Sequence, residues 1–274
     1  MKNEYIVSPL YDFAFAEIFG NQKNIDITRG FLKTLLDIPQ DEYDRLTVVS
    51  PILRRLFQKH KMGIVDLKLS TKSGKIIHID LQVDKKINMK NRILYYICRL
   101  IGDQLNWGDD YNKLHQVISI IICDHNMLEE EDSYINEYEL RNKHNRSFTK
   151  AVKLIILELP KLPEEDDSAV WRWLRFLKCK EKEEFEMLAK NYPDMEKPVY
   201  CAKKMSWFEI WRDFRFHKNL WKVDKRMREL YVRTEGIAEG KLETARNALK
   251  EGFSIDTVQR ITGLDLDIIK NLES

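Results

Sequence analysis

The sequence has almost no net charge and no long apolar run, and each absence excludes a class of protein. The 46 Lys and Arg nearly balance the 44 Asp and Glu, for a formal net charge of +2. Overall charge therefore identifies no partner, and any affinity for nucleic acid must come from a local patch. The longest apolar run, around residues 117–123, is far too short to cross a bilayer. Because the first residues lack an apolar stretch behind a basic start, no signal peptide is expected. We expect a cytoplasmic protein with no membrane partner.

Cysteine is scarce and glycine-rich nucleotide loops are missing. The four cysteines, Cys98, Cys123, Cys179 and Cys201, are far apart and have no paired spacing. This predicts reduced, buried thiols, not a disulfide framework or a zinc site. Without a Gly-rich phosphate loop or a nucleophile elbow, kinase, NTPase and serine-hydrolase functions have no support. Aromatic residues are present in numbers that support a real core, with 12 Phe, 11 Tyr and 6 Trp among 274 residues.

Hydrophobic periodicity predicts an α/β region followed by helices. The apolar residues alternate, cluster or recur at helical spacing in distinct segments. The predicted order is a helical run after Ser8-Pro9 that is interrupted at residues 20–21 and ends before Pro39, a β-rich segment at 46–57 broken by Pro51, a hairpin at 64–83, a helix at 88–106, and strands at 117–123 and 153–159. An acidic linker at 163–167 then precedes helices that continue to the end of the chain. The predicted domains are residues 1–162, 168–234 and 235–274.

The hairpin at residues 64–83 has one apolar and one polar face. A three-residue loop, Lys72 to Gly74, with glycine at the position that needs a positive φ, is a favoured connection. It pairs Lys68 with His78 and Asp66 with Asp80, and strand alternation then separates the faces. The polar face holds Asp66, Lys68, His78, Asp80 and Gln82. A shift of one residue would mix the two faces, so the register is well specified.

Two carboxylates facing each other across strands repel by a few tenths of a kcal/mol. A divalent cation would reverse the sign of that interaction. Mg²⁺ prefers oxygen ligands, and Asp66, Asp80 and the backbone carbonyl of Leu81 could supply three of them. Such an ion, with Mn²⁺ as a possible substitute, activates water and stabilises charge in phosphodiester hydrolysis. The alternative is an ordinary solvated hairpin face on which Lys68 and His78 neutralise the acids.

An acid in one strand followed by acid-x-Gln in the next resembles the PD-(D/E)xK nuclease superfamily. More narrowly, the chain resembles the recombination-promoting nuclease (Rpn) family, also described as PD-(D/E)xK family transposases. No single motif is highly specific, but the ordered set covers roughly residues 5–165. The matching stretches are Asp12–Gly20, Gly63–Asp66, Ile77–Gln82, Asn91–Tyr96, Gly108–Tyr111, Val117–Ile120 and Leu157–Lys161.

The resemblance implies a restriction-endonuclease-like core, a mixed sheet flanked by helices, and a metal-dependent DNA endonuclease. It matches Asp66 and Asp80 to the two acidic metal ligands. Gln82 stands at the position of the superfamily's catalytic lysine and would orient the attacking water. Asp12 matches an early acid of the family, an outer ligand or water relay. Arg92 matches a basic residue that would contact a phosphate.

The resemblance is broken at two positions. The family commonly has Glu at the position of Asp80 and Lys at the position of Ala16, and Lys68 is the candidate substitute for that missing cation. The alternative function is therefore a catalytically weakened or inactive nuclease-fold protein that acts in DNA binding or protein interaction. His78 is placed to act as a proton shuttle or phosphate contact, although an ordinary hydrogen-bonded histidine is the simpler reading.

The C-terminal third contains a basic segment and an acidic one. Residues 197–233 hold 11 Lys or Arg, 4 Asp or Glu and eight aromatics, a composition that suits DNA contact but equally a helical pair with an aromatic core. Residues 235–274 read as helices that end at Gly252 and Gly263, a Ser254 N-cap and a further helix from about Asp265. This resembles a helix-turn-helix end. Because the tail holds 5 basic and 8 acidic residues, protein association, including a homodimer, is favoured over DNA reading.

Overall fold

The computed structural model describes residues 6–49, 67–85, 88–204 and 243–264. The chain divides into two compact units, residues 1–207 and 208–274, and each is described by itself. Several predicted features lie outside the described residues: Asp66, the break at Pro51, residues 205–233 of the basic segment and the helix from Asp265.

The first unit contains most of the described elements. Its strands are β1 Thr47–Val49, β2 Leu67–Ser70, β3 Ile76–Gln82, β4 Val117–Cys123, β5 Ile135–Glu139 and β6 Val152–Glu158. Its α-helices are α1 Asp12–Phe19, α2 Ile25–Leu35, α3 Gln40–Asp44, α4 Met89–Gly102, α5 Ala169–Lys178, α6 Lys182–Asn191 and α7 Glu196–Lys204. Short 3₁₀ turns are η1 Gln22–Asn24, η2 Tyr111–Lys113, η3 Leu159–Lys161 and η4 Pro193–Met195.

The six strands form one mixed sheet in the order β1-β2-β3-β4-β6-β5. The pairs β1–β2 and β2–β3 are antiparallel, the pairs β3–β4 and β4–β6 are parallel, and the edge strand β5 is antiparallel to β6. All seven residues of β3 and of β4 are buried. The prediction that residues 117–123 form a strand buried on both faces is confirmed, and β6 confirms the second apolar run.

The hairpin turn forms as the sequence predicts. Lys68 pairs with His78 and Leu69 with Ile77. The N–H of Thr71 donates to the carbonyl of Lys75 at 3.0 Å, and Gly74 has φ +89°. The register of the described part is therefore confirmed, while the pairing of Asp66 with Asp80 lies beyond it and stays a prediction.

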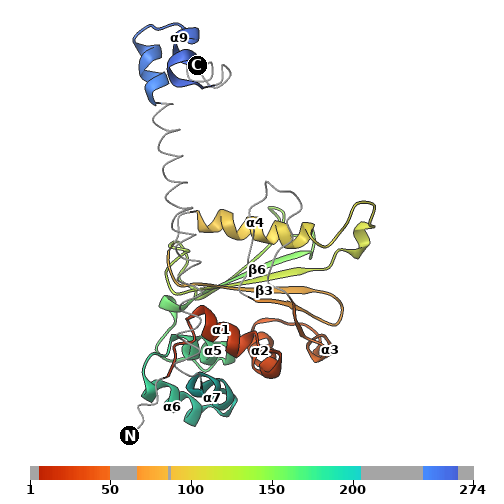
Figure 1. Cartoon of the computed structure of the whole chain (residues 1–274). Helices are drawn as coiled ribbons and strands as arrows, with labels where there is room; N and C mark the ends of the chain where they lie inside the picture. The colour runs from red at the N-terminus through yellow and green to blue at the C-terminus, as the bar shows by residue number, and fades with distance from the viewer. Residues whose placement is uncertain (1–5, 50–66, 86–87, 205–242, 265–274) are drawn as a thin grey trace. The chain divides into compact units, whose positions relative to one another are not determined.

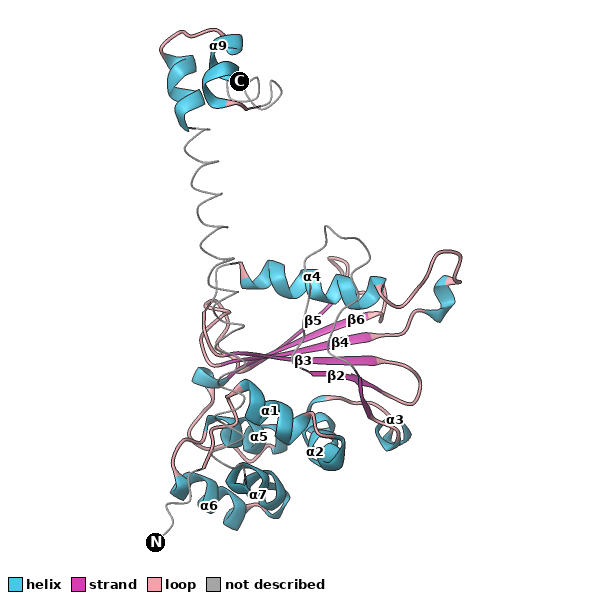
Figure 2. Ribbon diagram, in the orientation of Figure 1, coloured by secondary structure: helices cyan, strands magenta, loops and turns pink. Residues whose placement is uncertain are grey.

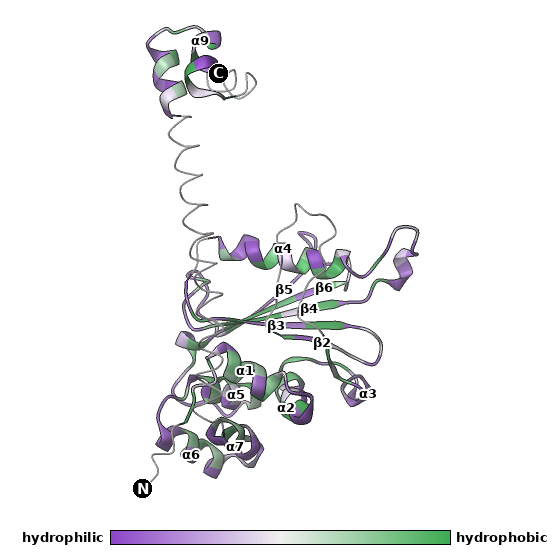
Figure 3. Cartoon of the chain, in the orientation of Figure 1, coloured by the Kyte–Doolittle hydropathy of each residue, from purple (hydrophilic) through white to green (hydrophobic). Residues whose placement is uncertain are grey.

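Helices cover both faces of the sheet (Figures 1 and 2). The helix α4 lies along one face, and α1, α2 and α5 lie on the other. Trp173 of α5 packs against Phe19 and Phe31, with ring centroids 6.2 and 5.8 Å apart, so α5 shares the core of α1 and α2. Figure 3 shows that the strands between these layers are rich in apolar residues. The predicted fold class, a mixed sheet flanked by helices with a helical C-terminal region, is confirmed.

The structure corrects one expectation, excludes one alternative and adds one strand. The alternative of a solvated hairpin face does not hold for β3, because His78, Asp80 and Gln82 are only 1–3% exposed. Cys98 is exposed on α4, although Cys123 and Cys179 are buried as predicted and all four cysteines are free. The strand β5 was not predicted, because its mostly exposed edge position carries no continuous apolar pattern.

The described part of the second unit is a pair of short helices. One includes residues 243–250, and α9 spans Ile255–Thr262. The predicted turn is confirmed: Gly252 has φ +84°, the Ser254 side chain accepts from Thr257 N–H, and Gly263 ends α9 with φ +64°. Ala245 and Val258 are buried between the two helices.

Candidate functional site

The polar residues of β3 lie on the face of the sheet that α4 covers. Asp80 pairs with Ile121 and Gln82 with Cys123 on β4, and paired residues share a face. Ile121 and Cys123 pack in one apolar cluster with Met89 and other residues of α4. The polar side chains therefore sit in the layer between α4 and the sheet, away from bulk water.

Asp80 and Gln82 form a buried polar pair. The amide nitrogen of Gln82 donates to Oδ2 of Asp80 at 2.6 Å, and both residues are 3% exposed. Within the described part of the chain Asp80 forms no ion pair, and Oε1 of Gln82 is buried without a partner. A buried carboxylate without a cation is costly, and a buried amide oxygen without a donor is also unfavourable. Both defects would be relieved by a bound cation and its water, so the donor set fits a hard divalent metal.

The backbone hydrogen bonds of β3 indicate which carbonyl could join Asp80 as a cation ligand. The carbonyl of Gln82 accepts from the N–H of Asp124 beyond β4 at 3.0 Å. Because in-plane backbone groups alternate along a strand, the carbonyl of Leu81 points to the β2 side of β3. Asp66 precedes Leu67 of β2 in the sequence and lies outside the described residues. Among the described residues, no three His, Cys, Asp or Glu side chains lie together in a way that could hold a metal ion.

His78 lies two residues before Asp80 on the same face. Its Nδ1 is 2.9 Å from Oγ of Ser119, and its Nε2 is buried without a partner among the described residues. Burial lowers the pKa of His78, Lys68 lowers it further, and Asp80 opposes both. The imidazole is therefore neutral at pH 7, so it does not neutralise Asp80 as a solvated hairpin face would require.

The other two predicted residues lie on different helices. Arg92 is on α4, the helix that covers the Asp80 face, and its guanidinium stacks over the Tyr96 ring at 5.3 Å. Asp12 is the exposed first residue of α1, which lies on the opposite side of the sheet (Figure 1). Ala16, one turn further along α1, is also exposed.

Glu158, at the end of β6, is a buried acid to which the sequence analysis assigned no role. It pairs with Cys123, which pairs with Gln82, so the three end one row across the sheet. Glu158 is fully buried and accepts from the backbone N–H of Met127 and Leu128 and from Lys161 Nζ at 2.7 Å. The sequence signal that could have predicted this buried acid is a glutamate at the end of an apolar strand with a lysine three residues later. Its partners satisfy it fully, so it anchors the loop after β4.

A mixed sheet between two helical layers, with a buried acid-x-Gln on an inner strand, defines the nuclease class that the sequence resembles. The profile of the PD-(D/E)XK nuclease family transposases matches residues 9–228, and the chain belongs to that family. The profile of the C-terminal HTH domain of the Rpn/YhgA-like nuclease family matches residues 238–274. Comparison with curated proteins and with solved structures gives no significant match.

Two further findings concern the cofactor of the family and the described helices. PD-(D/E)XK nucleases generally use divalent metal ions. Among the described helices, none has both the length and the apolar character needed to cross a membrane.

Proposed function

We propose that this protein is a Mg²⁺- or Mn²⁺-dependent DNA endonuclease of the recombination-promoting type, active in the cytoplasm. The observation that carries the proposal is the Asp80–Gln82 pair. Membership of a nuclease family supports hydrolysis of a phosphodiester bond as the reaction. The pair supports a metal-dependent version of it, because an oxygen-rich group is buried where a cation is needed.

Each residue has an assigned role in this proposal. Asp80, Asp66 and the Leu81 carbonyl would hold the cation, which lowers the pKa of bound water and stabilises charge on the phosphate. The amide of Gln82 is oriented by its bond to Asp80, which leaves Oε1 to accept a hydrogen bond from the attacking water and orient that water. Arg92 would contact a phosphate from α4. Asp12 would be an outer ligand or relay only around the strand ends, because α1 lies on the opposite side of the sheet from Asp80.

The test is nicking of supercoiled plasmid DNA with Mg²⁺, with Mn²⁺ and with EDTA. The wild-type chain should nick the plasmid only with a divalent ion, and Asp80→Asn and Asp66→Ala should abolish nicking. Asp41→Asn is the matched control, because Asp41 is an exposed carboxylate of α3. Equal cleavage by Asp80→Asn and by the wild type would show that the nuclease activity does not pass through this residue.

One observation favours a second function on the same fold. Ala16 is exposed on α1 without a charged group, at a position where the family commonly has Lys. An inactive protein of this fold would retain DNA in a salt-sensitive manner and would not cleave it with either metal. Calorimetric titration with Mn²⁺ separates the two functions. If the protein is an active nuclease, the wild type should bind one more equivalent of Mn²⁺ than Asp80→Asn. If it is inactive, the two proteins should bind the same amount.

The C-terminal domain is assigned a role in assembly. HTH domains are typically DNA-binding modules, and this one matches the family's HTH profile. Its net charge of −3 over residues 235–274 opposes contact with phosphates, so we assign the tail to association between two copies of the chain. Light scattering of the full chain should give the mass of a dimer, and a monomer at all concentrations would exclude this role.

A further inference from the structure

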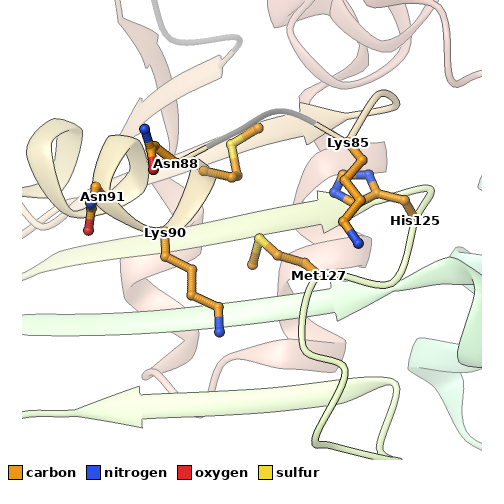
Figure 4. A pocket seen from close by; sticks show the side chains of 7 residues that line it. Lys85, Asn88, Lys90, Asn91, His125 and Met127 are labelled. Carbon is orange, nitrogen blue, oxygen red and sulfur yellow. The ribbon is translucent and has the colours of Figure 1, made fainter. Parts of the chain in front are cut away.

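A pocket of about 350 Å³ lies at the end of the sheet where β3 and β4 finish. Figure 4 shows its lining: Lys85 after β3, His125 and Met127 after β4, and the first turn of α4. The C-terminal ends of parallel strands meet at one edge, so the pocket opens at the same edge as Gln82. The bond from Asp124 N–H to the Gln82 carbonyl ties the two strand ends together.

The lining of the pocket is basic and rich in hydrogen-bond donors. Lys85, Lys90 and His125 contribute to it, together with two asparagines of the α4 start, and none of its lining residues is acidic. Both ring nitrogens of His125 are buried without a partner among the described residues. The α4 N-terminus adds partial positive charge, and the side chain of its N-cap residue, Asn88, does not cap it. Cations, imidazole donors and helix N–H groups together suit a phosphate group.

One acid outside the lining contacts a lysine of this pocket. Nζ of Lys85 is 2.7 Å from Oε1 of Glu129, and the two side chains are 66% and 71% exposed. The hydrogen bond from Lys85 lowers the pKa of Glu129, with added attraction from Lys85 and Lys90. A carboxylate therefore already occupies one anionic contact. Because exposed ion pairs contribute little, a phosphodiester, whose single negative charge is shared by two oxygens, can displace it.

We propose that this pocket binds a backbone phosphate of DNA through Lys85 and Lys90, and that Glu129 is displaced when it does. This rests on the proposed function in taking DNA as the substrate, and it adds a named contact beside the reactive strand. Lys85 and Lys90 would fix the position of the duplex against the end of β3. Glu129 would act as an internal competitor that weakens DNA binding.

The test measures binding without cleavage, so it does not depend on nuclease activity. Fluorescence anisotropy of a labelled duplex is followed in EDTA over a series of salt concentrations, using the full chain. In Lys85→Gln/Lys90→Gln the slope of log K against log salt should become shallower by about 1 to 2, because each phosphate contact contributes about 0.9. Affinity at low salt should fall about tenfold or more. Glu129→Gln should bind several-fold more tightly than wild type.

The chain offers a matched control at the opposite end of β3. Lys72 and Asp41 form a similarly short, exposed ion pair at 2.9 Å, with side chains 46% and 59% exposed, beside the hairpin turn. Lys72→Gln should leave the salt slope unchanged, and Asp41→Asn should not tighten binding. If Lys72→Gln loses as much affinity for the duplex as Lys85→Gln/Lys90→Gln, the loss reflects the overall charge of the protein and the pocket assignment is wrong.

A second arm separates a backbone phosphate from a free one. Inorganic phosphate is added at constant ionic strength, with sodium chloride as the comparison. Weak competition by phosphate in the wild type, lost in Lys85→Gln/Lys90→Gln, supports the pocket. If millimolar phosphate abolishes duplex binding while an unlabelled duplex does not compete, the pocket is a free-anion site and the DNA assignment fails. If the wild type binds the duplex as expected but does not nick plasmid DNA, only the endonuclease proposal fails. Failure of the endonuclease proposal is therefore distinguishable from failure of the phosphate-pocket proposal.

Discussion

Replacing Asp80 by Asn tests whether the buried carboxylate of β3 is a metal ligand or a structural hydrogen-bond partner. Asp80 is 3% exposed, accepts from Gln82 and forms no ion pair within the described part of the chain. Asn has nearly the same volume and keeps an oxygen that can accept from Gln82. The substitution therefore removes the charge and changes little else.

The expected change in stability follows from two opposing effects. An ionised group buried without a partner costs several kcal/mol, whereas a hydrogen bond to a charged group contributes about 1.5–3 kcal/mol, of which Asn keeps part. We expect Asp80→Asn to raise the free energy of unfolding in EDTA by about 1–2 kcal/mol. For a unit of about 200 residues this is a rise in Tm of about 2–8 °C.

Metal should reverse the order of the two proteins. At a free ion concentration one hundred times Kd, the wild type gains about 2.7 kcal/mol, and the variant gains nothing at this site. Thermal unfolding in EDTA and in millimolar Mn²⁺ measures both effects. Asp103→Asn is the matched control, because this carboxylate is 8% exposed but lies 3.7 Å from Arg99, so losing its charge should destabilise the protein. The metal-ligand assignment fails if Asp80→Asn destabilises the metal-free protein as this control does, or if Mn²⁺ stabilises both proteins equally.

Three further predictions concern the rest of the first unit. Gly74→Ala should lower the free energy of unfolding by about 2 kcal/mol or more, measured by urea denaturation, because φ is +89° and a Cβ would lie 2.8 Å from the His115 ring. In native protein at pH 8, a thiol reagent should modify exposed Cys98 but not Cys123, whose pKa is raised to about 12 by burial and by neighbouring carboxylates; rapid reaction of both would contradict this. Burial raises the pKa of Glu42, but hydrogen bonds and a lysine from the hairpin turn outweigh it and lower it to about 2. This stability is present above pH 4.5 and is lost as pH falls towards 2, so Glu42→Gln should cost roughly 1 kcal/mol at pH 7, after allowing for solvent screening, and should flatten the acid limb of the unfolding curve.

The hairpin was predictable because local signals agree. Alternation sets the two faces, a glycine supplies the positive φ, and a one-residue slip would bury polar groups on the apolar side. The helix α4 and the strand β4 were predictable for the same reason, since their apolar periods are long and unbroken. The role of Asp80 as a metal ligand came from the facing carboxylates and from the resemblance, that of Gln82 came from the resemblance alone, and both stay predictions.

The burial of the polar face could not be read from the hairpin. A strand with one polar face has the same alternation whether that face meets water or a helix. The difference is made by α4, which returns over β4 and places Met89 and Ile93 against Ile121. Exposure of Cys98 has the same origin, because the rotation of α4 about its axis is set by that packing. The pocket could not be predicted from the sequence either, because its lining residues come from three separate segments.

The cover provided by α4 also restricts how a duplex would reach Asp80. The helix packs directly on Ile121 and Cys123, so the sheet face beside Asp80 is closed to a partner as large as DNA. The open approach is along the strand ends, where Gln82 finishes β3 and where Lys85 lines the pocket. A phosphate held there would lie a few residues of chain from the proposed metal ligands. Under both proposals, Lys85→Gln/Lys90→Gln should therefore lower nicking mainly through KM, whereas Asp80→Asn should lower it through kcat at unchanged duplex affinity in EDTA.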